Sequence, residues 1–375
     1  MINPQARLGR DQVTPGHLQR WARTAHNEIK PRRNLRGRNY FTNLRRSLRI
    51  SSRKITRFVA NSAIINEETT VVNATVFLHE INDITAPLGL TDGCVWNADQ
   101  SRFQYELIRN RTLTFNGEKI VEARVVAAHD ISHSYTIQVH MSKAGVLGSH
   151  IFICFQEKDG VFGPRVQPAV DNVLQSCSNV RVAASTSGKF TKRIMQDWFS
   201  EVFLQDVSDQ SILILDAWSG QGPGASLSSP NVLISYIPEG ATKYVQPLDV
   251  YFFRQYKLLV KNVVEVCREL YLGGQCRIKP GNRYFIIRLH SVCFNQLSHP
   301  RFSRMWRYAW RKPGYTVDGE SQPFENVIQI LLSPLNSPAA ICSVHNMNPI
   351  FKCVYCAAYI CHSCLLDPIH LHLTD

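Results

Sequence analysis

The sequence predicts an α/β protein: a mixed β-sheet flanked by helices, with a basic helical region before it and a small metal-binding module after it. Three observations predict this architecture. The unbroken apolar run Ile212–Leu215 stops at Asp216, which is typical of a strand buried on both faces of a sheet. Lysine and arginine crowd into residues 1–60. Cysteine and histidine pairs crowd into residues 342–372.

Length and composition limit the classes of protein that the chain can be. Its 375 residues allow about two or three domains. The net charge of +13 is uneven, which indicates a polyanionic partner, most simply nucleic acid, rather than general solubility. No run of 18 apolar residues is present, so no membrane span is expected, and the start lacks the apolar core of a secretory signal. Six of the eleven cysteines lie scattered in apolar segments, as expected of buried thiols in a reducing compartment: Cys94, Cys154, Cys177, Cys267, Cys276 and Cys293.

The first 60 residues predict a DNA-binding region of two amphipathic helices. Residues 12–29 place Leu18, Trp21 and Ala25 at helical spacing. Residues 39–59 carry apolar residues at i, i+3 and i+7 with arginines opposite, as in a helix that enters a DNA groove and continues into a basic tail. The alternative is a solvated basic helix face. Nine basic residues are expected at DNA phosphates, where counterion release makes binding salt-dependent: Arg33, Arg36, Arg38, Arg45, Arg46, Arg49, Arg53, Lys54 and Arg57. The same run would serve as a nuclear import signal, which predicts a nuclear location.

The first strands of the sheet follow a linker helix that is predicted over residues 61–93. Residues 94–107 predict the strand that carries Asp99. Residues 109–126 predict a hairpin with an Asn-Gly turn, and residues 133–156 predict two further strands joined at Lys143–Gly145.

The later elements alternate between strands and helices. Residues 160–175 are expected to be loop-rich, residues 180–184 to form a strand, and residues 187–204 to form a helix capped by Thr191. Another strand is expected within residues 231–240. Pro247 suits the first turn of a long helix, 247–271, which places Asp249 where the helix dipole keeps a carboxylate ionised. Residues 284–312 are predicted helical, and residues 316–340 are predicted to be a linker.

Three aspartates are the candidate catalytic residues. Asp99, Asp216 and Asp249 each border an apolar segment, and Asp216 ends a central strand, where open α/β sheets usually place their sites. Acidic oxygens are the ligands that Mg²⁺ prefers, and polynucleotidyl transfer needs two divalent ions about 3.5–4 Å apart over the phosphodiester. The alternative is that each aspartate is a cap or turn residue.

The local sequences around these acids resemble a known family. The segments ILDAWSGQ, IPEGATKYVQPLDVYFFRQYK and NADQSRFQYEL are similar to the catalytic domain of the mariner/pogo superfamily of DDE transposases, on its Tigger/pogo-like side. The resemblance spans roughly residues 60–315. It implies a ribonuclease-H-like catalytic domain over residues 94–315, with Asp99, Asp216 and Asp249 as catalytic ligands of Mg²⁺ or Mn²⁺.

The same resemblance extends to the N-terminal region and to the partners. VTPGHLQRWA and FTNLRRSLRISSRKITRF are similar to the helix-turn-helix of centromere-protein-B-type and pogo transposases. This implies that residues 1–60 form a helix-turn-helix DNA-binding region, truncated relative to the family. Double-stranded DNA is the expected partner, and a homodimer would pair two DNA ends.

The C-terminal residues 341–375 predict a small zinc module. Four ligand pairs at short spacing would build two tetrahedral Zn²⁺ sites, the first pair joining the third and the second joining the fourth. The eight ligands are Cys342, His345, Cys353, Cys356, Cys361, Cys364, His370 and His372, with His362 as a possible substitute. So short a segment needs metal to fold, and the alternative is a set of unconnected reduced thiols. The spacing resembles a B-box, and the module would contact DNA or a protein partner.

The favoured hypothesis for function is a DDE transposase or endonuclease that hydrolyses phosphodiesters and then transfers a DNA strand. The alternative, from another class, is a domesticated DNA-binding protein on a transposase scaffold that performs no chemistry. A third hypothesis is an interaction protein that works through its zinc module alone.

Overall fold

A computed structural model of the chain describes residue 46 and residues 61–85, 87–106, 133–207, 210–217, 227–337, 340–367 and 371–372. The chain divides into two units, residues 1–69 and residues 70–375. The described residues lie mainly in the second unit.

Most of the predicted DNA-binding region lies outside the described residues. Arg46 is described; it is helical and exposed to solvent. The expected helix over residues 12–29 and the eight other basic residues are not among those described: Arg33, Arg36, Arg38, Arg45, Arg49, Arg53, Lys54 and Arg57.

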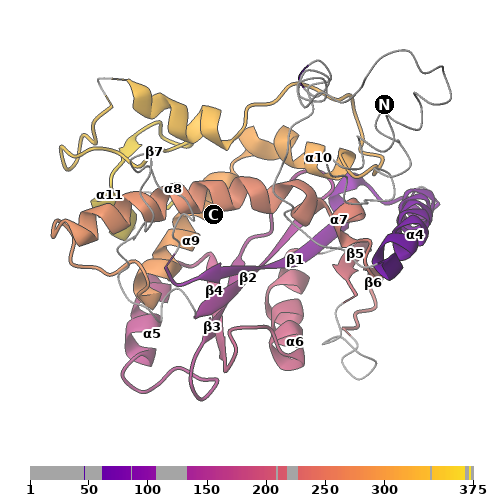
Figure 1. Ribbon diagram of the computed structural model, residues 1–375, viewed down its shortest axis with the longest axis horizontal. Coiled ribbons are helices and arrows are strands. Elements are labelled where there is room, and N and C mark those ends of the chain that lie inside the picture. Colours follow the sequence, from indigo (N-terminus) through magenta and orange to yellow (C-terminus); the bar gives the residue numbers. More distant parts are fainter. Residues whose placement is uncertain are drawn as a thin grey trace, which may run out of the picture. The chain divides into compact units, whose positions relative to one another are not determined.

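The centre of the second unit is a mixed six-stranded sheet in the order β4-β3-β2-β1-β5-β6 (Figure 1). The strand β2 is antiparallel to both of its neighbours, β1 and β3, whereas the pairs β3–β4, β1–β5 and β5–β6 are parallel. The strands are β1 (Val95–Gln104), β2 (Ser134–Ser142), β3 (Ile151–Gln156), β4 (Val180–Ser185), β5 (Ser211–Asp216) and β6 (Val232–Ile237). The prediction of a ribonuclease-H-like mixed sheet flanked by helices is confirmed.

Each face of the sheet is covered by helices, so the central strands are buried on both sides. Helix α6 (Lys192–Glu201) packs on one face, where Trp198 and Phe199 join Leu213 and Leu215 of β5 in an apolar cluster. Helices α8 (Phe253–Leu272), α9 (Arg283–Ser298) and α10 (Ser303–Arg311) cover the other face (Figure 1). The apolar side chains of β5 alternate between the two faces of the sheet, so they pack against the helices on both sides.

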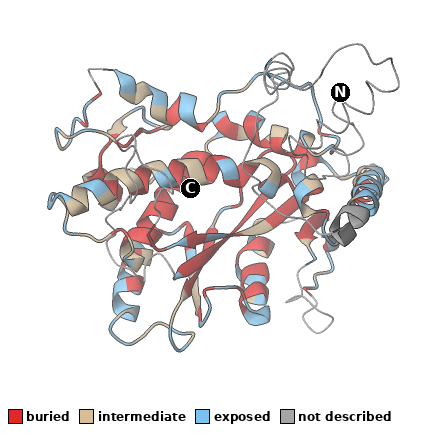
Figure 2. Cartoon of the chain, in the orientation of Figure 1, coloured by how far each residue is buried: buried red, intermediate tan, exposed pale blue. Residues whose placement is uncertain are grey.

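Helix α9 is buried on all sides. Every residue from Phe285 to Leu297 is buried, and Figure 2 shows the strands and the inner helices coloured as buried. The helix therefore lies inside the protein, and its polar side chains, which include Asn295 and Gln296, are buried together with the apolar ones. Its neighbours include β3, β4, α8 and α5 (Gln167–Gln175).

Two segments differ from what the sequence suggests. Residues 160–175 were expected to be loop-rich, but Gln167–Gln175 form α5, with Pro168 in the first turn and Val170 and Val173 buried. Proline fits a first turn because its missing N–H has no helical partner there. The expected hairpin, residues 109–126, lies outside the described residues.

The segment expected as a linker, residues 316–340, holds the π-helical turn Ile328–Leu332 and the 3-10 turn Ser333–Asn336. Leu331 is fully buried in the main apolar core. The tail beyond it forms β7 (Phe351–Lys352), β8 (Tyr359–Ile360) and α11 (His362–Leu366), and it contributes Phe351 and Leu365 to that same core. The linker and tail are therefore packed parts of the second unit.

Helix α4 (Asn61–Thr85) enters the second unit with one packed face. Ala74, Phe77 and Ile81 are buried at helical spacing, whereas Val72 and Val76 are exposed. Among the described residues, no helix has the length and apolar character needed to cross a membrane.

Candidate functional site

Asp99, Asp216 and Asp249 line a single cavity. Asp99 lies within β1 and Asp216 is the last residue of β5. Asp249 lies in the π-helical turn Leu248–Phe252 that leads into α8, close to the helix start that the sequence predicts. Residues 150 positions apart in the chain therefore meet at the carboxyl end of β5, beside the middle of β1.

The register of β1 against β5 explains why the first two acids meet. The strands are parallel, and Asn97 is opposite Ile214, so Asp99 and Asp216 both lie two residues further along. Successive side chains of a strand alternate between faces, so Asp99 shares a face with Asn97, and Asp216 shares one with Ile214. That face is the one covered by α8, which Asp249 precedes.

The buried side chain of Asn97 ties the third acid to the sheet. Its Nδ2 donates a hydrogen bond to the carbonyl oxygen of Ile214, at 3.0 Å. Its Oδ1 accepts one from the backbone N–H of Leu248, at 3.2 Å. One amide thus fixes the start of the turn that carries Asp249 relative to both acid-bearing strands.

Two further side chains act directly on the acids. The hydroxyl of Thr242, in α7 (Thr242–Val245), donates a hydrogen bond to Oδ1 of Asp216 at 2.8 Å. Lys257, two turns after Asp249, lies near Asp249 and Asp99, and the two carboxylates oppose the lowering of its pKa that burial produces. Lys257 also lies over the ring of Phe103, with 5.6 Å between Nζ and the ring centroid.

The electrostatics of the cavity favour a bound cation. Burial, followed by the charges of Asp249 and Asp216, raises the pKa of Asp99 well above its ordinary value. Burial also raises the pKa of Asp249, against the hydrogen bond that it accepts from Asp99. Carboxylates held this close repel one another when all are ionised, so the set requires a proton or a cation between them.

The donor set and the space fit divalent cations. Oδ2 of Asp99 is buried and has no hydrogen-bond partner among the described residues. The cavity has a volume of about 250 Å³. Such a volume equals the space of roughly eight waters in the liquid, enough for two small ions and their water ligands.

A larger cavity, of about 750 Å³, lies beyond the end of β1 and is lined by residues that include Tyr105, Arg165 and Lys279. Among the described residues its lining has a single carboxylate, Glu157, whose Oε1 lies 2.7 Å from Nε of Arg283 in an ion pair. A lone, paired carboxylate does not make a divalent-metal site, so the smaller cavity is the candidate active site.

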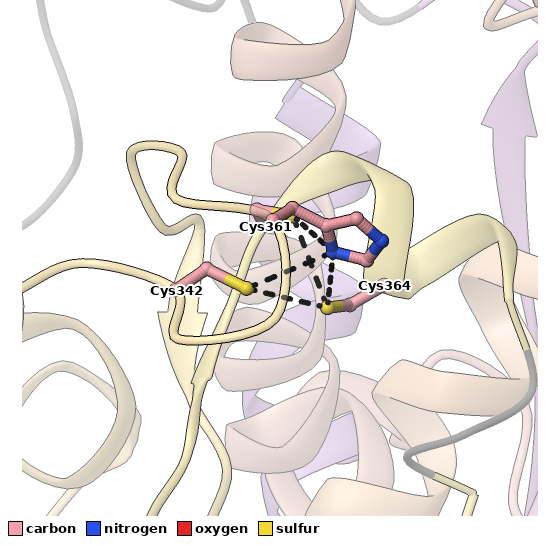
Figure 3. Close-up of side chains that lie close together, drawn as sticks. Cys342, Cys361 and Cys364 are labelled. Atoms are coloured by element: carbon pink, nitrogen blue, oxygen red, sulfur yellow. Dashed lines mark hydrogen bonds between the residues drawn. The ribbon is translucent and has the colours of Figure 1, made fainter.

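The first and third ligand pairs of the tail form one compact group. Cys342, His345, Cys361 and Cys364 bring their ligand atoms within 4.8 Å of one another. Nδ1 of His345 lies 3.8, 3.4 and 3.3 Å from the sulfurs of Cys342, Cys361 and Cys364. The sulfur of Cys364 lies 3.5 Å from that of Cys342 and 3.8 Å from that of Cys361. Figure 3 shows the three labelled sulfurs converging on a ring nitrogen.

These separations fit tetrahedral zinc. Bond lengths of 2.3 Å to sulfur and 2.0–2.1 Å to nitrogen place two sulfurs about 3.8 Å apart, and a sulfur and a nitrogen about 3.6 Å apart. The observed separations lie between 3.3 and 3.8 Å. The group can therefore hold a metal ion at its centre.

The second and fourth ligand pairs meet in a second group. Cys353, Cys356 and His372 also bring their ligand atoms within 4.8 Å of one another. His370 lies outside the described residues, so the structure places three of the four expected ligands. His362 is 8% exposed and is not in either group. The two groups interleave along the chain in the cross-brace order.

Sequence reasoning missed Asn97 and Thr242. A signal for Asn97 exists, because residues two apart in a strand share a face and Asn97 precedes Asp99 by two. Thr242 lies in a turn that is remote in sequence from Asp216, and no periodicity links the two. The two α9 residues that contact the second Cys/His group, Asn295 and Gln296, carry no sequence signal.

A comparison with known protein families gives a match over the part of the chain that carries two of the three acids. Residues 162–265 match the family described as DDE superfamily endonuclease. No curated protein matches the chain.

Some solved structures resemble the chain at low sequence identity, and these include complexes of the Mos1 mariner transposase. The Mos1 mariner paired end complex with Mn has 8% identity and a TM-score of 0.41, covering 84% of this chain and 78% of that one. The Mos1 strand transfer complex has 10% identity and a TM-score of 0.42, with the same coverage. A pre-cleavage Mos1 transpososome has 10% identity and a TM-score of 0.35, covering 82% of this chain and 80% of that one. Over residues 162–265, the chain is similar to the DDE superfamily endonucleases, and Asp216 and Asp249 lie inside that match.

Proposed function

We propose that the protein is a DDE-type transposase, a metal-dependent endonuclease that hydrolyses DNA phosphodiesters at transposon ends and transfers the released strand. The observation that carries the proposal is the convergence of Asp99, Asp216 and Asp249 in one cavity. The family match over residues 162–265 supports it.

The chain's own residues would hold and orient the reacting groups. Asp99, Asp216 and Asp249 would bind two Mg²⁺ or Mn²⁺ ions, which when bound supply Lewis-acid stabilisation of the attacking and leaving oxygens. Thr242 restrains Oδ1 of Asp216 and leaves Oδ2 for a ligand. Asn97 holds the turn of Asp249 against β1 and β5.

Basic side chains on the same elements would position the DNA backbone. Lys243 follows Thr242 on α7, and Arg254 is the second residue of α8, the helix that follows Asp249; both are exposed. Lys257, close to two of the acids, would neutralise a phosphate at the cavity. The basic residues between Arg33 and Arg57 would bind the backbone of double-stranded DNA, and two chains would pair two ends. Such a protein would work in the nucleus.

The tail would bind two Zn²⁺ ions as a cross-brace. The first site would use Cys342, His345, Cys361 and Cys364. The second would use Cys353, Cys356 and His372, with His370 as its fourth ligand. The tail would also offer an exposed surface, including Ile341 and Val344, to a protein partner.

A nicking assay on supercoiled DNA tests the proposed activity. With Mg²⁺ or Mn²⁺, the wild type should convert supercoiled DNA to open circles. Asp99→Asn, Asp216→Asn and Asp249→Asn should each lower the rate by roughly 10³-fold, because each removes a ligand that acts on the transition state. DNA retention in a filter assay should remain.

The matched control is Asp197→Asn, a carboxylate on the exposed side of α6, which should nick at the wild-type rate. A wild type that retains DNA but never nicks it would support the domesticated DNA-binding alternative. Full activity in any of the three acid variants would refute the assignment of that residue.

A further inference from the structure

The Cys/His tail is packed against the catalytic core rather than appended to it. Phe351, Cys361 and Leu365 are fully buried, in the same apolar cluster as Val139 of β2 and Leu259 of α8. The hydroxyl of Tyr284, at the start of α9, donates a hydrogen bond to the carbonyl oxygen of Leu366. Helix α9 is therefore the element that the tail covers.

Gln296 of α9 contacts the second Cys/His group directly. The side chain is completely buried. Its Nε2 donates a hydrogen bond to the sulfur of Cys353 at 3.4 Å, and its Oε1 accepts one from the backbone N–H of Val354 at 2.8 Å. A donor to sulfur stabilises the thiolate, which is the form that binds a metal.

Asn295 holds the other side of the same group. Its Nδ2 donates to the carbonyl oxygen of His372 at 2.7 Å, and its Oδ1 accepts from the N–H of His372 at 3.2 Å. The hydroxyl of Tyr355 donates to the carbonyl oxygen of Asn295, and the rings of Tyr355 and His372 stack, with 5.0 Å between their centroids. Two adjacent helix residues thus orient ligands from both halves of one group.

We propose that α9 forms the outer shell of the second metal site, with Asn295 and Gln296 as its positioning residues, so that zinc binding by the tail and folding of the catalytic core are a single event. The proposal rests on the zinc binding proposed above and is independent of the nuclease chemistry. Ligands that are oriented by a core helix bind metal more weakly while that helix is displaced, and the helix loses its cover when the tail has no metal to fold around.

The test uses the full chain and compares Gln296→Leu with Ser291→Ala. Ser291 is also fully buried on α9, but its hydroxyl bonds to Asn179, away from the tail. Zinc content and affinity are measured by competition with a chromophoric chelator. The wild type should hold two ions. Gln296→Leu should bind one of them roughly 10- to 100-fold more weakly and the other unchanged. Ser291→Ala should lower the unfolding midpoint and keep both affinities.

A second measurement follows the unfolding of the core with and without a strong chelator. The near-ultraviolet circular dichroism of the buried Trp306 and Trp310 reports the packing of the core. Chelation should lower the midpoint of this signal in the wild type. Wild-type affinity at both sites in Gln296→Leu would overturn the proposal, as would a core signal that chelation leaves unchanged. A wild type that binds no zinc would overturn it too, while leaving the nicking result unaffected.

Discussion

Asn97 accepts a hydrogen bond from the backbone N–H of Leu248, so a strand residue two positions before Asp99 sets the start of the turn that carries Asp249. The same amide donates to Ile214, two positions before Asp216. The relative positions of all three acids therefore depend on one fully buried side chain, that of Asn97. The precision of the cavity depends on this amide as much as on the aspartates.

Asn97→Ala should lower both stability and activity. The change leaves a buried N–H and a buried carbonyl without partners, which costs about 2–4 kcal/mol in the free energy of unfolding. The nicking rate should fall more than tenfold at saturating Mg²⁺, because the turn of Asp249 is no longer held. Denaturant titration and the nicking assay measure the two effects. Ser101→Ala, on the same face of β1, serves as the comparison, and an equal loss of nicking there would contradict the role of Asn97.

Asp99→Asn should stabilise the metal-free protein while it abolishes nicking. Burial and the neighbouring acids make an ionised Asp99 costly, and a neutral isostere removes that cost, with a gain of about 1–3 kcal/mol. The Mg²⁺-dependent rise in melting temperature should shrink at the same time. Thermal melts with and without Mg²⁺ measure both. A variant less stable than the wild type without metal would show that Asp99 has a packing role instead.

Stability should fall in acid because of His290. This imidazole is fully buried between the hydroxyls of Tyr135 and Tyr256, and burial lowers its pKa to about 3. An unfolded histidine has an ordinary pKa of 6.5, so between these values the unfolded state binds the extra proton. Stability is therefore full above about pH 6.5 and falls by up to about 4 kcal/mol as the pH drops toward 3.

Denaturant titrations at several pH values test the His290 prediction. His290→Gln should be less stable than the wild type at pH 7 because it loses ring packing. It should also show a flatter pH dependence between pH 6.5 and 4. An unchanged slope in the variant would assign the acid sensitivity to other groups.

Cys361→Ser should reduce the zinc content from two ions to one and lower the melting temperature of the whole second unit. Cys361 is fully buried, and its sulfur lies 3.4 Å from Nδ1 of His345. Cys177→Ser, a buried thiol outside the tail, should keep two ions. Metal analysis after gel filtration distinguishes them, and two retained ions in Cys361→Ser would remove Cys361 from the ligand set.

The sheet and the acid positions were accessible to sequence reasoning because they depend on local patterns. The apolar run of β5 and the Pro247 start of the helix place Asp216 and Asp249 at the ends of elements. The spacing of the cysteine pairs indicates interleaved groups. These features can be predicted because they depend on residues that are close together in the sequence, such as those of one strand or one cysteine pair.

What the sequence could not predict depends on contacts between distant segments. The short helix α5 was expected to be loop; it spans nine residues and fully buries two of them, Val170 and Val173, so its sequence carries little helical periodicity. The docking of the tail on α9 is made by Asn295 and Gln296, whose side chains look like ordinary polar residues of a helix. Residues 316–340 resemble a linker because they contain several prolines and serines, yet Leu331 is fully buried in the core.

The cover over α9 has a consequence for the order in which the protein is made. Cys353, Cys361 and His372 follow all three aspartates in the chain, so they leave the ribosome after them, and the packing around α9 is complete only when they arrive. A chain still under synthesis carries all three aspartates but not the finished cavity around them. Any chemistry at the acid cavity would then begin only after the tail has been translated.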